Sequence, residues 1–152
     1  MLDKLFPAKQ EKYKPLSIVI VESDREWEIR LTNAIKNKRP NYKILIVDNL
    51  EQIFSLLHGD IKIDLVFFDI STVIELNNIT LLKAIEPEIS LIHWSSCQHP
   101  EIIELLYSLG VNCFCVKGSL KAIAEVMDLA AYYPQSLYVD QMLYDCLPLL
   151  RS

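Results

Sequence analysis

The chain has 152 residues, which suits a single domain with one hydrophobic core. Hydrophobic residues make up 51% of it and charged residues 23%, a balance typical of a folded protein and not of a disordered one. Only three glycines occur, which excludes a glycine-rich phosphate loop, and the net charge of −5 argues against a surface that grips nucleic acid throughout.

The amino-terminal stretch lacks the apolar segment of a secretory signal, and no apolar run reaches the length of a membrane span. We therefore expect a cytoplasmic protein that does not bind membranes. The four cysteines include no CxxC pair, and Cys113 and Cys115 alternate on an expected strand, so both should point into one packed layer. Buried structural thiols are favoured over redox or metal-binding roles.

Residues 1–14 are charged and show no periodicity, which predicts a flexible tail before a domain over residues 15–134. The apolar run 16–21 predicts a strand that is covered on both faces. Asp24 is placed to cap the helix that follows, and Pro40 ends that helix. Its expected apolar face consists of Trp27, Leu31, Ala34 and Ile35.

Two further strands are expected at 43–47 and 64–68, with a short helix over 50–57 between them. The stretch 70–79 gives no clear pattern and could prolong the strand or open a loop. The segment 81–85 looks helical.

A fourth strand is expected at 88–94, and Pro100 suits the first turn of the next helix. Gly110 closes that helix before a fifth strand at 111–116. Ser119 is placed to cap the helix after it.

Residues 136–147 predict one more helix, within a carboxy-terminal extension over residues 135–152. One side of this extension is apolar, and we expect it to dock on the domain, on a partner or on a second copy of the chain. The apolar residues are Leu137, Met142, Leu143, Cys146, Leu149 and Leu150.

Alternating strands and helices predict an α/β fold with a doubly wound, five-stranded parallel sheet in the order 2-1-3-4-5, as in flavodoxin-like proteins. In such sheets ligands bind beyond the carboxyl ends of the strands, near the point where the strand order reverses. A polar residue follows or ends four of the expected strands, and we expect the four to meet there. They are Glu22, Asp69, Ser95 and Lys117.

The strings DLVFFD, VKGS and YYPQSL resemble the receiver (CheY-like) domain of bacterial two-component response regulators, in particular the LuxR/NarL subgroup. The resemblance covers about residues 16–133. It implies that Asp69 is the phosphoacceptor, that Ser95 is the conserved hydroxyl and that Lys117, 22 residues later, is the conserved lysine. Phe114 occupies the position of the aromatic switch residue.

The resemblance also implies that a histidine kinase or phosphotransfer protein donates the phosphoryl group, and that Mg²⁺ assists the transfer. The metal ligands would be Glu22 and Asp69, with Asp24 as a further candidate. Receivers usually carry two adjacent acids after the first strand, but here Ser23 follows Glu22. We therefore expect a weakened Mg²⁺ site.

Plainer roles exist for the same residues. Asp69 could cap the segment after its strand, Ser95 could cap the next helix, and Phe114 could be ordinary core. His93 and His99 are interpreted as structural or capping residues.

Two functions therefore stay open. One is an atypical stand-alone receiver in phosphorelay signalling, which accepts a phosphoryl group on Asp69 and acts through protein–protein contacts. The other is a pseudo-receiver that binds proteins or dimerises without phosphorylation. No DNA-binding module fits in the residues after the domain, so we expect no direct contact with nucleic acid. A flavodoxin-like enzyme is disfavoured, and the only expected catalysis is Mg²⁺-dependent self-phosphorylation and dephosphorylation on Asp69.

Overall fold

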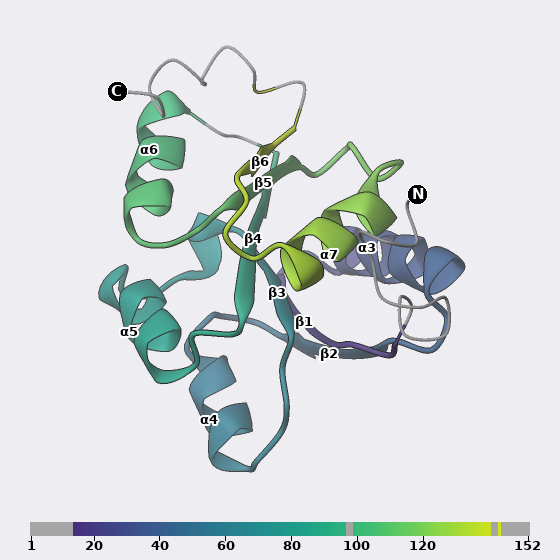
Figure 1. Ribbon diagram of the computed structural model, residues 1–152, viewed down its shortest axis with the longest axis horizontal. Coiled ribbons are helices and arrows are strands. Elements are labelled where there is room, and N and C mark those ends of the chain that lie inside the picture. Colours follow the sequence, from purple (N-terminus) through teal and green to yellow (C-terminus); the bar gives the residue numbers. More distant parts are fainter. Residues whose placement is uncertain (1–13, 97–98, 141–142, 144–152) are drawn as a thin grey trace.

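The computed structural model describes residues 14–96, 99–140 and 143, which form a parallel six-stranded sheet between two layers of helices (Figure 1). The strands are β1 (Ser17–Val21), β2 (Lys43–Val47), β3 (Leu65–Phe68), β4 (Ser90–Ser95), β5 (Cys113–Val116) and β6 (Tyr138–Val139). The helices are α3 (Arg25–Lys38), α4 (Gln52–His58), α5 (Asn77–Ile85), α6 (Pro100–Ser108) and α7 (Ile123–Tyr132), with a 3-10 turn η1 (Ile70–Thr72).

The sheet order is β2-β1-β3-β4-β5-β6, so the predicted order of the first five strands is confirmed. In the register, Val21 lies opposite Val47 on one side and opposite Phe68 on the other. Strands β1 and β3 are therefore neighbours whose last residues are level. This register brings Glu22 and Asp69, the residues that follow them, to the same edge.

Each face of the sheet has its own hydrophobic core. Leu31 and Ile35 of α3 and Met127 of α7 pack against the face that carries Phe67 and Trp94. Helices α4, α5 and α6 pack against the opposite face through Ile53, Ile79, Leu82, Ile103 and Leu106. Strands covered on both faces explain why the sequence shows continuous apolar runs instead of alternation.

The expected helix signals are confirmed at three places. The side chain of Asp24 accepts hydrogen bonds from the backbone N–H groups of Glu26 (2.9 Å) and Trp27 (3.3 Å) at the start of α3. Pro100 is the first residue of α6. Gly110 follows α6 with φ of +106°, a conformation that favours glycine.

The prediction of a helix over 136–147 is wrong at its start, because Tyr138 and Val139 form β6. The main chain of this segment pairs with β5: the N–H of Tyr138 donates to the carbonyl of Asn112 (2.8 Å), and that of Asp140 to Phe114 (2.9 Å). An open strand edge offers hydrogen bonds that a helical pattern in the sequence does not reveal. The rest of this predicted helix falls mostly on residues 141–142 and 144–147, outside the described residues, as do residues 1–13 of the tail predicted over 1–14.

The prediction that Ser119 caps a helix is also wrong. Helix α7 begins at Ile123, after Ala122, and the N–H of Ser119 donates to the carbonyl of Val116 (2.9 Å). Ser119 therefore closes a turn after β5. In the unclear stretch, Ile70–Thr72 form η1, and α5 begins at Asn77, earlier than the predicted helical segment.

In the part of the chain that the structure describes, no helix combines the length and the apolar character needed to cross a membrane.

Candidate functional site

Four polar residues meet at the carboxyl ends of β1, β3, β4 and β5, as the sequence predicted. Their exposed fractions are low, at 3% for Glu22, 8% for Asp69, 3% for Ser95 and 5% for Lys117. Ser95 ends β4, and its carbonyl accepts a hydrogen bond from the N–H of Lys117 (3.2 Å). Parallel strands bring these residues together although they lie far apart in the sequence.

Lys117 contacts both acids of the site. Its Nζ lies 2.6 Å from Oε1 of Glu22 and 3.4 Å from Oδ2 of Asp69. The contact with Glu22 is a buried ion pair. Oε2 of Glu22 accepts a hydrogen bond from the N–H of Asp24 (3.0 Å). One ammonium group thus compensates two buried carboxylates.

Two tryptophans enclose the same ammonium group. Nζ of Lys117 lies 5.2 Å from the ring centroid of Trp94 and 5.8 Å from that of Trp27. The two indoles meet edge to face with centroids 5.9 Å apart. Cations are attracted to aromatic faces at these distances, so the rings add to the forces that hold Lys117 in place. This arrangement was not predicted from the sequence, although Trp94 directly precedes Ser95.

Asp69 is held at both of its carboxylate oxygens. Oδ1 accepts a hydrogen bond from the N–H of Ser71 (3.0 Å), the second residue of η1, and Oδ2 faces Lys117. Burial alone would raise the pKa of Asp69, but the Ser71 hydrogen bonds, Lys117 and His93 together bring this pKa below its ordinary value. Asp69 is therefore ionised at neutral pH. Asp69 thus caps the segment after its strand, as one prediction had it, and also lies against Lys117 at the sheet edge, as the other had it.

His93, interpreted from the sequence as a structural or capping residue, is a neighbour of the site. It is fully buried, and its Nε2 accepts a hydrogen bond from the N–H of Ile70 (3.1 Å), the residue after Asp69. Its ring lies between Phe68, with centroids 5.4 Å apart, and Phe114, at 6.3 Å. A signal was present, because His93 precedes Ser95 by two positions on one strand and so shares its side of the sheet.

Phe114 is fully buried in the core beneath α4, α5 and α6. Its strand position lies opposite His93 in the register. Phe114 is thus a core residue, as one interpretation had it, and its role as a switch stays a prediction.

Glu51 anchors the loop between Asp69 and α5. Its carboxylate accepts hydrogen bonds from the N–H groups of Ile74 and Glu75 (3.1 Å each) and from the side chain of Asn78 (2.7 Å). Desolvation of Glu51 would raise its pKa, but these hydrogen bonds bring it below the ordinary value. Nothing in the local sequence pattern singled out this residue.

Metal binding at the edge would depend on few donors. Within the described ranges, no group of three His, Cys, Asp or Glu side chains is arranged to hold a metal ion. Glu22 and Asp69 supply two carboxylates, while the side chain of Asp24 caps α3. Mg²⁺ is commonly bound by one or two carboxylates together with phosphate oxygens and water. Glu22 and Asp69 are therefore the two carboxylates that would hold Mg²⁺, and Lys117 contacts both of them.

The structure tests the capping role predicted for Ser95 and the burial predicted for Cys113 and Cys115. Helix α6 has its cap position at His99, so Ser95 does not cap that helix. Cys113 and Cys115 lie in the same core layer, as predicted, and burial raises the pKa of Cys113 to about 12. Thiols with such high pKa values react poorly, because the thiolate is the nucleophile.

No protein-family model and no curated protein matches the sequence. Solved structures do match. The isolated receiver domain of RcsB from Salmonella enterica serovar Typhimurium superposes with a TM-score of 0.70 at 11% identity, over 88% of this chain and 99% of that one. This chain has the receiver-domain fold of bacterial response regulators.

Other proteins with the receiver fold superpose similarly. A LuxR family DNA-binding response regulator from Silicibacter pomeroyi gives a TM-score of 0.66 at 14% identity, over 84% of this chain and 98% of that one. The signal receiver domain of a DNA-binding response regulator from Colwellia psychrerythraea gives a TM-score of 0.59 at 24% identity, over 72% of this chain and 98% of that one.

Proposed function

We propose that this protein is an atypical signalling receiver in which Asp69 accepts a phosphoryl group. The observation that carries the proposal is the meeting of Glu22, Asp69, Ser95 and Lys117 at one edge of a receiver-fold sheet. The isolated RcsB receiver, which superposes on this chain, was solved with the phosphomimetic BeF3−. A comparable chemistry at the same edge is the simplest function for these residue types.

In the proposed reaction a carboxylate oxygen of Asp69 attacks the phosphorus of a donor. A new bond joins that oxygen to phosphorus, and the bond from phosphorus to the donor breaks, with its electron pair leaving on the donor atom. The lowered pKa keeps Asp69 ionised and ready to attack. The donor class is a phosphohistidine of a kinase or phosphotransfer protein.

The neighbours of Asp69 have complementary roles in this proposal. The ammonium group of Lys117 neutralises oxygens of the arriving phosphoryl group, and the hydroxyl of Ser95 donates a hydrogen bond to one of them. Mg²⁺, when held by Glu22 and Asp69, would supply further neutralisation of phosphoryl charge. The phosphorylated protein then acts through contacts with a downstream protein or a second copy, and it needs no enzymatic activity on other substrates.

The phosphoacceptor role is tested by adding acetyl phosphate and Mg²⁺ to the protein and measuring its intact mass. We expect a gain of one phosphoryl group that is absent in Asp69→Asn, a variant of nearly the same shape. A second control, Asp48→Asn, changes an acid near the end of neighbouring strand β2 and should keep the mass gain. If the wild-type mass stays constant at every Mg²⁺ concentration, Asp69 is not a phosphoacceptor.

One observation favours a second candidate, a pseudo-receiver that binds proteins without phosphorylation. Lys117 lies closer to Glu22 than to Asp69, and Ser71 already occupies Oδ1 of Asp69. An ammonium group so placed stands where a divalent cation would neutralise the two acids. The same mass measurement separates the candidates, since this one predicts no phosphoryl gain.

A further inference from the structure

Three adjoining cavities form a groove at the amino ends of the strands. Asp69 lies at the opposite, carboxyl ends of the strands. The first cavity, of about 180 Å³, is lined by Lys14 where the described chain begins. The second, of about 280 Å³, shares Asp64 and Glu88 with the first. The third, of about 390 Å³, shares Leu57 and Glu86 with the second. We call these three cavities together the basal groove.

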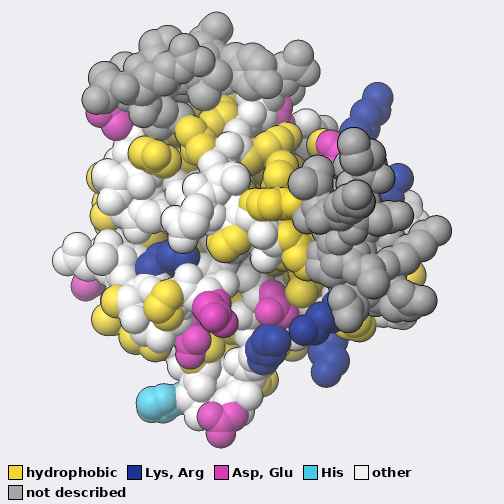
Figure 2. Space-filling model, viewed as in Figure 1, with side chains coloured by type: hydrophobic (Ala, Val, Ile, Leu, Met, Phe, Trp, Pro, Cys, Tyr) yellow, Lys and Arg dark blue, Asp and Glu magenta, His cyan; other side chains and the backbone are white. Residues whose placement is uncertain are grey.

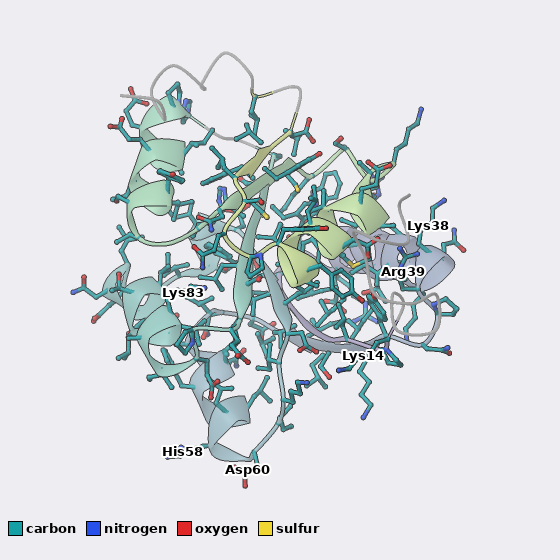
Figure 3. The ribbon with its side chains drawn as sticks, viewed as in Figure 1. Lys14, Lys38, Arg39, His58, Asp60 and Lys83 are labelled. Carbon is teal, nitrogen blue, oxygen red and sulfur yellow. The ribbon has the colours of Figure 1, made fainter. Side chains whose placement is uncertain are left out.

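The middle of the basal groove is acidic. Asp60, Asp64, Glu86 and Glu88 line it together with one lysine, Lys62. That lysine is itself 3.8 Å from Asp64. Figure 2 shows acidic side chains gathered in the lower half of this face, with lysine and arginine side chains on one side of them and hydrophobic ones on the other; Figure 3 labels Asp60 and Lys14 in this lower region.

The far end of the basal groove is apolar. Phe54 and Leu57 of α4 line it together with Ile85 of α5. Half of the surface of Ile85 is exposed, and Leu81, one helical turn earlier, is 48% exposed. Exposed aliphatic side chains that line a hollow indicate a surface that another apolar group covers.

We propose that the amino-terminal segment of this chain, residues 1–13, docks in the basal groove. The chemistry of the segment matches the groove in order. Read backward from Lys14, the segment presents Tyr13, then Lys12 and Lys9 with Glu11 between them, and then Phe6, Leu5 and Leu2, the last separated from the other two by Lys4 and Asp3. Lysines thus reach the acidic middle cavity, and apolar side chains reach Phe54 and Ile85.

The segment is long enough to make these contacts. Phe6 precedes Lys14 by eight residues, which span up to about 26 Å when extended. The groove runs from β1 past β3 to β4, two strand spacings or roughly 10 Å, and then about 10 Å further to the helix layer. The segment of the same chain is favoured over that of a second copy, because its attachment at Lys14, at one end of the groove, keeps its effective concentration high.

The proposal is tested by a carbodiimide, which joins lysines to carboxylates only where they touch. We expect links from Lys9 or Lys12 to Glu86 or Glu88 in the full chain, and none to Glu104 or Glu125, two exposed acids elsewhere. In an equal mixture of nitrogen-15-labelled and unlabelled protein, the two peptides joined by each link should be both labelled or both unlabelled. That result identifies a contact within one molecule. Links of mixed isotope would overturn the proposal in favour of a second copy.

A pair of variants tests the apolar end without touching any lysine. Phe6→Ser should reduce the yield of these links roughly tenfold, because the apolar anchor is lost, while Phe6→Leu should keep most of it. On the groove side, Ile85→Ser should act like Phe6→Ser, and since Ile85 is half exposed this variant should still fold. If the link yields are the same in all variants, or if Glu104 and Glu125 are linked equally well, the segment does not dock in the basal groove.

Discussion

The ammonium group of Lys117 lies 2.6 Å from Oε1 of Glu22, a shorter distance than its 3.4 Å to Oδ2 of Asp69. All three side chains are almost completely buried, so each charge depends on the others for compensation. The stability of this edge and its proposed chemistry therefore involve the same atoms.

Replacing Lys117 by Met should destabilise the protein by about 3–5 kcal/mol at neutral pH, because two buried carboxylates lose their counter-charge. Urea denaturation measures this loss. The double variant Lys117→Met with Glu22→Gln should recover part of it, and Lys121→Met, at an exposed lysine nearby in the sequence, should change little. Equal stability of Lys117→Met and wild type would show that the ion pair makes no net contribution.

Replacing Ser23 by Asp should tighten Mg²⁺ binding by about tenfold or more, since a third carboxylate joins Glu22 and Asp69 at the edge. A Mg²⁺ titration followed by the fluorescence of Trp94 or by calorimetry gives the affinity. Ser23→Asn supplies a similar shape without the charge and should have a much smaller effect. Unchanged affinity in Ser23→Asp would mean that the edge does not hold the ion.

Replacing His93 by Leu should cost about 1–3 kcal/mol of stability, because the buried N–H of Ile70 loses its acceptor. The exposed His58 provides the matched control, and His58→Leu should stay within about 0.5 kcal/mol of wild type. Both values come from denaturation curves. A stable His93→Leu would indicate that the N–H of Ile70 finds another acceptor.

Acid should destabilise the protein through Asp69 and Glu51, whose pKa values are both lowered by folding. A lowered folded-state pKa means that the stabilisation is complete above the unfolded values of about 3.9 and 4.3, and that it is lost as the pH falls through the folded-state values. Glu51→Gln should cost about 1–2 kcal/mol at neutral pH, where it loses hydrogen bonds to a charged acceptor. It should also make the decline of stability below about pH 4 less steep. Parallel declines in wild type and variant would contradict this assignment.

Much of the fold was readable from local pattern. The apolar runs that end at Val21 and Phe68 identified buried strands, and Asp24, Pro100 and Gly110 marked helix ends correctly. Strand β6 was not readable, because Tyr138 and Val139 gain their partners from the edge of β5 and not from their neighbours in sequence. Ser119 failed as a cap for a similar reason, since its N–H bonds back to Val116.

The main residues of the candidate site were predicted from the sequence, but the residues that surround and hold them were not. Parallel topology alone was enough to bring Glu22, Asp69 and Lys117 together. The hydrogen bond of His93 and the clamp by Glu51 depend on how loops fold over the sheet edge. Such contacts have no fixed spacing in the sequence, so periodicity cannot reveal them.

Strand β6 covers the outer side of β5 at Cys113 and Phe114. Among the described strands, β2 is thus left as the terminal one at the opposite margin, with Leu45 and Ile46 partly open to solvent. A foreign peptide that lengthened this sheet would find five residues to align beside at β2, but only the two residues Tyr138 and Val139 at the margin formed by β6.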